Sequence, residues 1–326
     1  MTAAWIAAVQ ETSGAIPWYP GGPADPWNHV EAAMGLDIGG YHAEAEAAYR
    51  WLAETQNDDG SWYAEYQNGI VTNAAKDTNF TAYIAVGVLH HAVLRGSSFL
   101  VRLWPTVRAA VDFVLRMRSQ EGAIQWRDTS PQFLLTGCAS IHQSLLCAAT
   151  IASEVAEPRP DWLDAASDLA SVIRERPELF TPKPHAMDWY YPVLYSVVTG
   201  QAADRRLAES WDRFVEPDLG VRCVADQPWV TGGETAELAL TLALRGDSRA
   251  RDLLAGIETL RHSDGSYWTG YQFANKVIWP PERTTWTAGA VLLARAAVAG
   301  DPGVHRVFRS RDFPVVPREA ERYPIE

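Results

Sequence analysis

The sequence has few cysteines, a shortage of basic residues and no segment typical of export. Its three cysteines, Cys138, Cys147 and Cys223, include no CxxC pair. An odd number without paired spacing argues against a disulfide framework and is typical of a reducing compartment. The N-terminal residues lack the basic and apolar parts of a signal peptide, and no uninterrupted apolar run of 18 residues occurs. The net charge of −12 disfavours a phosphate backbone as partner. We therefore expect a cytoplasmic protein with no nucleic-acid and no membrane partner.

Motifs for several kinds of chemistry are also missing. The Asp-x-Asp-Asp acid of class II terpene cyclases does not occur. Cys223, Asp226 and His262 come nearest to the zinc ligands of protein prenyltransferases, but their spacing differs. Adjacent histidines occur only at His90-His91, inside an apolar segment where we expect core residues. Without a glycine-rich phosphate loop either, the sequence predicts neither a metal nor another cofactor.

Tryptophan is abundant, with 14 residues, and part of this abundance belongs to a recurring turn. The clearest example is Gln56-Asn57-Asp58-Asp59-Gly60-Ser61-Trp62. Glycine allows the left-handed conformation that ends a helix, and the following aromatic can fold back onto the helices. Related turns occur around Gly14, Gly122 and Gly265, and weaker ones around Phe180 and Gly220. Six turns spaced roughly forty to sixty residues apart indicate a repeat architecture.

Between these turns, amphipathic segments alternate with segments that are apolar on all sides. A helix that is apolar all round is typical of a buried position, whereas an amphipathic helix covers it from outside. We therefore predict an all-α fold, an (α/α)6 toroid of six helical hairpins, with residues 1–326 forming a single domain. The predicted outer and inner helices are 3–10 and 25–34, 41–55 and 77–94, 99–117 and 130–151, 162–174 and 188–198, 202–214 and 234–244, and 250–260 and 282–298.

The whole chain resembles the six-hairpin, (α/α)6-toroid superfamily. Its turns resemble repeats that are labelled prenyltransferase-like or squalene-cyclase-like. Four motifs resemble an actinobacterial toroid family that carries this label: Asp77-Thr78-Asn79, Met187-Asp188-Trp189-Tyr190-Tyr191-Pro192, Gly233-Glu234-Thr235-Ala236-Glu237 and Trp279-Pro280-Pro281-Glu282-Arg283-Thr284-Thr285-Trp286. Toroids include hydrolases, lyases, cyclases and prenyltransferases, so the resemblance alone does not identify the reaction.

One acidic residue stands near the predicted start of each inner helix, and aromatic residues are frequent in the same segments. Acids at helix N-termini are also explained by capping and by the helix dipole. Aromatic rings, however, stack on the C–H faces of sugars while carboxylates bind the hydroxyls, so we interpret these segments as a sugar-binding mouth. The predicted substrate-binding residues are His29, Glu31, Asn79, Trp126, Asp188, Trp189, Tyr190, Glu234, Trp268, Tyr271, Trp279, Arg283 and Trp286.

Glycoside cleavage requires one carboxylic acid and one carboxylate. In the six-hairpin glycosidases that the chain resembles, these come from the starts of the third and last inner helices, which implies Asp128 as acid and Glu282 as base. The adjacent Arg283 is expected to keep Glu282 ionised. Asp77 is an alternative acid, because Asp77-Thr78-Asn79 places three polar groups in one helical turn. The sequence leaves the choice between Asp77 and Asp128 open.

These observations together predict a glycoside hydrolase that acts on an oligosaccharide or polysaccharide, with inversion. The chain also resembles the mycobacterial hydrolases of methylmannose polysaccharide. That resemblance implies an endo-acting α-(1→4)-mannosidase and an intracellular, partly methylated substrate. Two alternatives remain: a terpenoid cyclase or prenyltransferase-like protein that holds an isoprenoid among its aromatic residues, and a non-catalytic glycan-binding module. The oligomeric state is left open.

Overall fold

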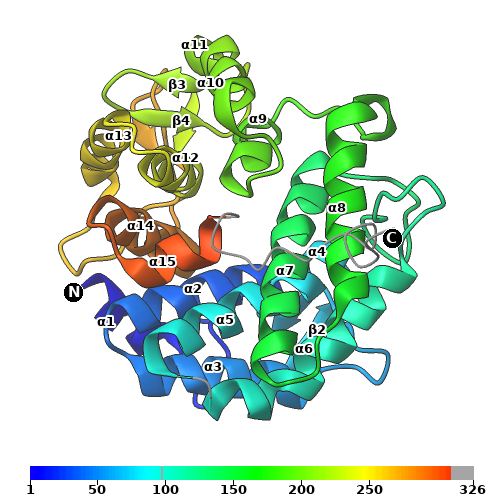
Figure 1. Cartoon of the computed structure of the whole chain (residues 1–326). Helices are drawn as coiled ribbons and strands as arrows, with labels where there is room; N and C mark the ends of the chain where they lie inside the picture. The colour runs from blue at the N-terminus through cyan, green and yellow to red at the C-terminus, as the bar shows by residue number, and fades with distance from the viewer. Residues whose placement is uncertain (97, 310–326) are drawn as a thin grey trace.

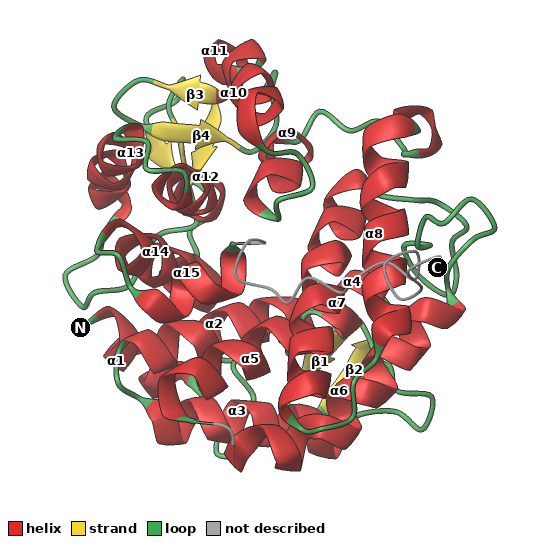
Figure 2. Ribbon diagram, viewed as in Figure 1, coloured by secondary structure: helices red, strands yellow, loops and turns green. Residues whose placement is uncertain are grey.

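The computed structural model describes residues 1–96 and 98–309, and helices dominate this part of the chain (Figure 2). The helices alternate between an inner and an outer position along the sequence. The inner set is α2 (Pro26–Ile38), α4 (Thr78–Ala82) continued by α5 (Ile84–Arg95), α7 (Leu135–Glu154), α9 (Ala186–Leu194), α12 (Gly232–Leu244) and α14 (Thr285–Val298). The outer set is α1 (Thr2–Val9), α3 (His42–Thr55), α6 (Ser98–Arg116), α8 (Pro160–Glu175), α10 (Gly200–Glu209) and α13 (Arg249–Ile257). The remaining helices are short: η1 (Pro177–Leu179), α11 (Trp211–Phe214), η2 (Glu258–Leu260) and α15 (Pro302–Phe308).

The inner helices contact one another in a closed cycle. α2 contacts α5, α5 contacts α7, α7 contacts α9, α9 contacts α12, α12 contacts α14, and α14 returns to α2. Figure 1 shows these helices around a common centre, with α3, α6, α8, α10 and α13 outside them. Each inner helix therefore has another inner helix on either side, in agreement with its largely apolar composition. The prediction of a mainly helical chain is confirmed.

Some predicted helix limits differ from the structure. The third inner helix begins at Leu135, not at 130, because Trp126 N donates to Gln132 O (2.7 Å) and holds the preceding residues in a loop. The fourth inner helix ends at Leu194, four residues before the predicted end, and Ser196 beyond it has a positive φ of 57°. A left-handed residue cannot continue an α-helix.

The structure adds a feature that the all-α prediction does not describe, because several connections into the inner helices form short antiparallel strands. β1 (Glu65–Gln67) and β2 (Ile70–Asn73) form a hairpin before α4. A second sheet has the order β3 (Val215–Glu216), β4 (Gly220–Arg222), β5 (Trp229–Thr231), β6 (Gly270–Gln272) and β7 (Val277–Ile278). β-Branched and aromatic residues favour these strands. The pairing of β5 with β6 joins the connections that lead into α12 and α14.

The recurring turn joins successive outer helices. Gln56 Nε2 donates to Gly60 O (2.9 Å) in its own turn and to Thr106 O (3.0 Å) in α6. Gly60 has a φ of +89°, and the carbonyl oxygen of Ala109 lies 2.1 Å from where a Cβ would stand. Gln10 makes the same two kinds of contact, to its own turn and to α3. The motif that dominates the sequence is therefore a structural joint.

One helix in the described part of the chain, α7, is long and apolar enough to cross a membrane by length and composition alone. Its most apolar stretch is 78% buried inside the molecule, as in the core helix of a soluble protein.

Candidate active site

A cavity of about 440 Å³ lies where the inner helices begin. The first turns of α2, α4, α7, α9 and α14 line it, and Cys223, between β4 and β5, adds to the wall. These helices share one end of the ring because every connection from an outer helix enters the ring on the same side. Aromatic and apolar side chains with a few polar groups are typical of a ligand pocket. The apolar lining includes Trp27, Phe80, Trp126, Leu134, Met187 and Trp286.

Asp77 is the carboxylic acid in the wall of this cavity. It precedes α4 and accepts hydrogen bonds from Asn79 N (3.0 Å) and Phe80 N (3.2 Å), so it caps the helix. Its exposed fraction is only 2%. Burial raises the pKa of Asp77 to about 6, although the hydrogen bond from Phe80 and the charge of Arg127 act in the opposite direction. A carboxyl with this pKa can hold a proton close to neutral pH and donate it.

Basic side chains surround Trp126 on the same side of the cavity. The guanidinium of Arg127 lies 3.6 Å from the centre of the Trp126 ring, and the ammonium of Lys183 lies 5.5 Å from it. Two buried polar atoms near Asp77, Nε of Arg127 and Oδ1 of Asn79, have no hydrogen-bond partner among the described residues. Both residues line the cavity, and a buried polar atom without a partner is uncommon in proteins.

Three further glutamates, Glu31, Glu234 and Glu237, are buried on the inner helices. Tyr83 donates to Glu31 (2.9 Å), and burial raises the pKa of Glu31 to about 7. Tyr190 and Tyr191 both donate to Glu237. Burial, and to a smaller extent the negative charge of Glu31, raise the pKa of Glu237 well above its usual value. Thr231 donates to Glu234. Tyr191 also lines the cavity, so this polar cluster reaches its wall.

Asp188 lies in the first turn of α9 and is half-buried. Its carboxylate accepts from Thr136, which lines the cavity. Burial raises the pKa of Asp188, while the hydrogen bond from Thr136 and the charge of Lys183 lower it. Asp188 therefore adjoins the cavity through Thr136.

Glu282 lies in the segment that leads into α14 and is half-buried. Its backbone carbonyl accepts from Thr269 N (2.9 Å), which ties the segment to β6. Among residues 1–96 and 98–309 its carboxylate makes neither a hydrogen bond nor an ion pair. Glu282 is not part of the cavity wall, but Trp286, one helical turn further along, is.

The expected partnership of Arg283 with Glu282 is wrong. The Arg283 side chain donates to Asp264 (2.5 Å) and Ser266 (3.0 Å) and contacts His262 (3.0 Å). These three residues belong to the recurring turn before β6. Arg283 therefore braces that turn, and its charge is directed at Asp264 rather than at Glu282.

The structure separates the two candidate acids. Asp128 is exposed and accepts a hydrogen bond from Lys76 N (3.0 Å), outside the cavity wall. Asp77 is buried and lines the cavity. Arg127 pairs with the Asp77 carboxylate (3.7 Å), whereas the neighbouring Asp128 carboxylate binds the backbone of Lys76.

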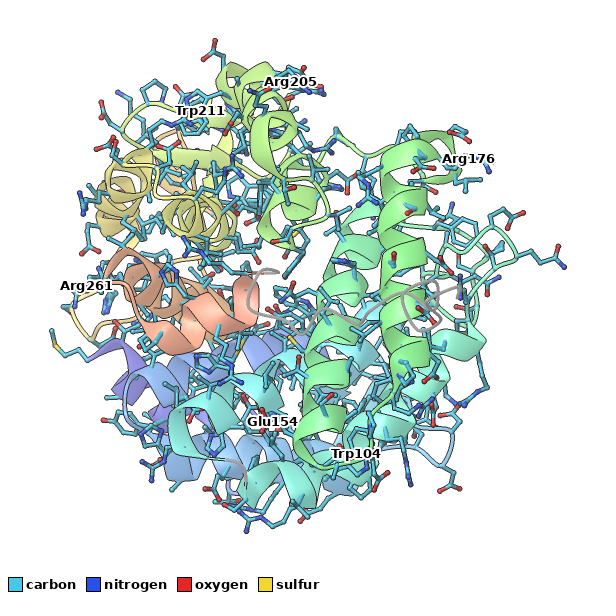
Figure 3. The ribbon with its side chains drawn as sticks, viewed as in Figure 1. Trp104, Glu154, Arg176, Arg205, Trp211 and Arg261 are labelled. Atoms are coloured by element: carbon cyan, nitrogen blue, oxygen red, sulfur yellow. The ribbon has the colours of Figure 1, made fainter. Side chains whose placement is uncertain are left out.

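Not all predicted sugar-binding aromatics reach the cavity. Trp126 and Trp286 line it, whereas Trp189 is 5% exposed and stacks on Phe214 at 5.3 Å. Trp189 also packs edge-on against Trp211, which lies at the outer surface (Figure 3).

Trp268, Tyr271, Trp279 and His29 are not part of the cavity wall either. Trp268 packs against the Arg283 guanidinium at 5.3 Å, Tyr271 is half-buried in β6, and Trp279 is 50% exposed. His29 is fully buried and binds the backbone of Ile16 and Ala48, and burial lowers its pKa to about 4. His29 is therefore a neutral core residue.

Sequence analysis missed several cavity residues, notably Arg127, Lys183, His185, Tyr191 and Cys223. A local signal existed for Arg127, which follows Trp126 directly. Nothing in the local sequence brings Cys223 to the cavity, because its place depends on pairing with the distant residue His185: Ala186 N donates to Cys223 O (3.0 Å), and His185 pairs with Val224.

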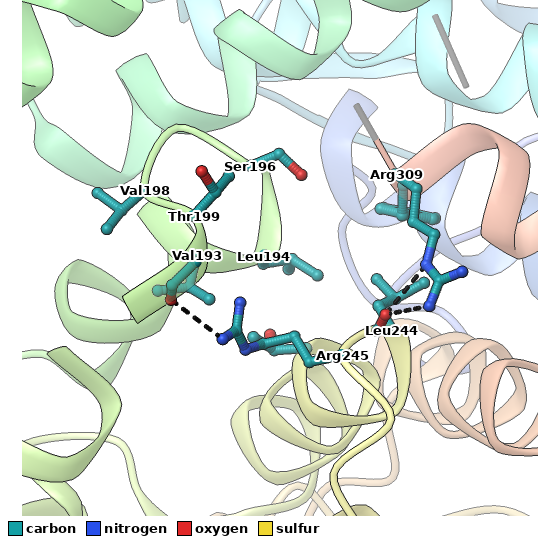
Figure 4. A pocket seen from close by; sticks show the side chains of 11 residues that line it. Val193, Leu194, Ser196, Val198, Thr199, Leu244, Arg245 and Arg309 are labelled. Carbon is teal, nitrogen blue, oxygen red and sulfur yellow. Dashed lines mark hydrogen bonds between the residues drawn. The ribbon is translucent and has the colours of Figure 1, made fainter. Parts of the chain in front are cut away.

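A second hollow of about 420 Å³ lies at the opposite ends of α9 and α12 (Figure 4). Arg309 donates to Leu244 O on one side, and Arg245 reaches Gly200 O on the other. Its described lining contains no carboxylate, so it does not suit acid–base cleavage of a glycoside. In the described part of the chain, no three His, Cys, Asp or Glu side chains gather to hold a metal ion.

Comparisons with known proteins point to glycan chemistry. No family model matches the chain. A protein of Mycolicibacterium hassiacum named MMP endo-(1,4)-3-O-methyl-alpha-D-mannosidase is 46% identical over 320 residues, which cover 96% of this chain and 89% of that protein. A solved wild-type glycosidase superposes with a TM-score of 0.76 at 18% identity, over 91% of this chain and 95% of that chain. A D-mannose isomerase gives 0.70 at 11% identity, over 92% and 95%. At such low identities the two structures show a shared fold only.

Proposed function

The chain belongs to the family of the MMP endo-(1,4)-3-O-methyl-alpha-D-mannosidase of Mycolicibacterium hassiacum, and from this premise we propose that it cleaves α-(1→4) bonds inside a 3-O-methylated mannan. The observation that carries the proposal is 46% identity across nearly the whole chain. The cavity adds an independent argument, because it combines aromatic walls with a buried carboxyl group. This relationship supports the glycosidase interpretation of the sequence and not the prenyltransferase-like label of its repeats.

We further propose that the described helices form an (α/α)6 toroid within a single domain. The closed cycle of inner-helix contacts and the glycosidase superposition support this assignment.

Asp77 is the general acid in this proposal. The acid of a glycosidase must be protonated when the substrate binds and must lie where the glycosidic oxygen enters. Asp77 meets both requirements through its burial in the cavity wall and its pKa of about 6. Asp128 is exposed to solvent and does not line the cavity, so it meets neither requirement.

Glu282 is the base in this proposal. A base must accept a proton from water, and the Glu282 carboxylate has no competing donor in the part of the chain that the structure describes. The buried Glu31, Glu234 and Glu237 instead accept from tyrosine or threonine hydroxyls. Inversion requires the acid and the base to stand about 6.5–9.5 Å apart in the complex with substrate.

The substrate-binding groups are Asn79, Arg127, Trp126 and Trp286. Asn79 Oδ1 and Arg127 Nε offer a buried acceptor and donor that lack partners among the described residues. Trp286 and Trp126 supply the apolar surfaces on which sugar rings stack.

Product analysis tests this function. Purified protein is incubated with 3-O-methylated α-(1→4)-mannan, unmethylated α-(1→4)-mannan, an α-(1→4)-glucan and a prenyl diphosphate, and the products are identified by mass. We expect internal cleavage of the methylated mannan into oligosaccharides. Products from the prenyl diphosphate alone, or binding of every glycan without cleavage, would contradict the proposal.

A further inference from the structure

A pair of tryptophans lies at the surface beside the cavity. The ring of Trp279 is 50% exposed, and Trp229 meets it edge-on, with ring centres 4.9 Å apart and an interplanar angle of 76°. Val277, 46% exposed, and the half-buried Ile278 precede Trp279 in the chain. We call these four residues the rim platform. Exposed apolar groups that gather in this way mark interaction surfaces.

The rim platform is held in place by the second sheet. Trp229 Nε1 donates to Trp279 O (2.7 Å), and Trp279 N donates to Gly270 O (3.0 Å). Trp229 itself pairs with Gln272 across β5 and β6. These bonds fix the ring of Trp229 and the backbone of Trp279, so the platform loses little conformational entropy when a ligand stacks on it.

Two connections join the rim platform to residues of the cavity wall. Cys223 N donates to Trp229 O (3.3 Å), and Cys223 is a wall residue. In the other direction, the chain from Trp279 passes Glu282 and reaches Trp286, a second wall residue. The platform is therefore linked to the wall through Cys223, on the side where an extended glycan would meet it.

We propose that the rim platform binds the methylated glycan beyond the bond that is cleaved. This inference rests on the proposed function. Each 3-O-methyl group replaces a hydroxyl hydrogen by an apolar group, which enlarges the surface that can pack on a tryptophan ring. The exposed side chains of Trp279 and Val277 are both apolar, so they can pack against these methyl groups. The platform thus favours long, methylated chains over short or unmethylated ones.

The test compares Trp279→Ala with the parent on a long methylated mannan and on the shortest methylated oligosaccharide that is cleaved. Loss of one stacked aromatic should lower kcat/KM on the long chain by roughly 3–10-fold through KM, with kcat preserved. The short substrate should be cleaved at the parent's rate, and the difference should shrink on unmethylated mannan. Val101→Ala is the matched control, because Val101 is 66% exposed on the outer helix α6. Val101→Ala should leave kcat/KM unchanged on both the long and the short substrate.

Equal losses on long and short substrates, or no loss on either, would overturn the inference while leaving the proposed function intact. If the parent cleaves neither substrate, the proposed function fails, and calorimetric titration with uncleaved methylated mannan decides the inference. Weaker binding by Trp279→Ala then supports the platform, and unchanged binding overturns it. Loss of a dimer in Trp279→Ala, with unchanged glycan binding, would instead identify the platform as a contact between two copies of the chain.

Discussion

The Asp77 carboxylate and the Arg127 guanidinium lie 3.7 Å apart in the wall of the cavity. Two opposing effects therefore determine the pKa of Asp77. Burial raises the pKa of Asp77 to about 6, and the positive charge of Arg127 limits that rise. The guanidinium of Arg127 also stacks on the ring of Trp126, so Asp77 and Trp126 together hold it in position.

Replacing Arg127 should therefore raise the pKa of Asp77 further. In Arg127→Met, the alkaline limb of the kcat/KM profile should move upward by roughly 1 pH unit, because an opposite charge within a few ångströms is removed. Lys183→Met is the control, since Lys183 also lies near Trp126 but makes no ion pair with Asp77 in the described structure. An alkaline limb that stays in place in Arg127→Met, or that moves equally in Lys183→Met, would contradict this electrostatic coupling.

Glu282→Gln should lower kcat by about 10²–10⁴-fold, because the amide cannot accept a proton from water. Glu234→Gln is the comparison: Glu234 is buried and bonded to Thr231, so its replacement should affect unfolding more than turnover. Turnover and urea unfolding are measured for both variants. If Glu282→Gln keeps near-full activity, the base moves to Glu234 or Asp188.

Glu31 should make stability depend on pH. Its pKa is raised from 4.5 to about 7 in the folded state, so its contribution is complete below pH 4.5 and is lost as pH rises through about 7. Glu31→Gln stays neutral and can still accept from Tyr83. Relative to the parent, the variant should therefore gain on the order of 3 kcal/mol of unfolding free energy between pH 4.5 and 8. Urea unfolding at both pH values measures this, and a pH-independent difference would contradict it.

Gly233→Ala should disturb the cavity wall. A Cβ at this position would stand 2.0 Å from the ring of Trp286, which must then move. We expect a loss of about 1–3 kcal/mol of unfolding free energy and a raised KM. Gly137→Ala is the control, because Gly137 lines the cavity but a Cβ there would come no closer than 3.6 Å to its neighbours in the described part of the chain. Equal effects of the two substitutions on unfolding and on KM would contradict the role of the Trp286 ring position in substrate binding.

The helical part of the fold was open to prediction because its signals are local. The N-cap Asp25 and Pro26 mark the start of α2, where the structure has it, and the apolar composition of 77–94 anticipates the burial of α4 and α5. The strands had no comparable signal. Val230 pairs with Tyr271 from a connection two helices away, and such long-range pairing leaves little local pattern.

The candidate site was only partly predictable for the same reason. Asp77 and Asn79 could be identified because a helix start exposes polar groups to the cavity. The direction of a side chain depends on its tertiary neighbours, however, and sequence adjacency misled us at Arg283. Its guanidinium donates to Asp264, which lies 19 residues earlier in the recurring turn before β6. Trp189 was similarly misplaced, because Phe214 and Trp211 hold it away from the cavity.

The most direct test of the account is the pH dependence of kcat/KM on 3-O-methylated mannan for the parent, Asp77→Asn and Asp128→Asn. Asparagine is also a good N-cap, so Asp77→Asn should keep its fold. The parent should lose activity about tenfold per pH unit above pH 6, as the Asp77 proton dissociates. At pH 5, Asp77→Asn should be lower by about 10²–10⁴-fold, and Asp128→Asn should match the parent. The account would be contradicted by an Asp77→Asn enzyme that retains most of its activity with the same alkaline limb.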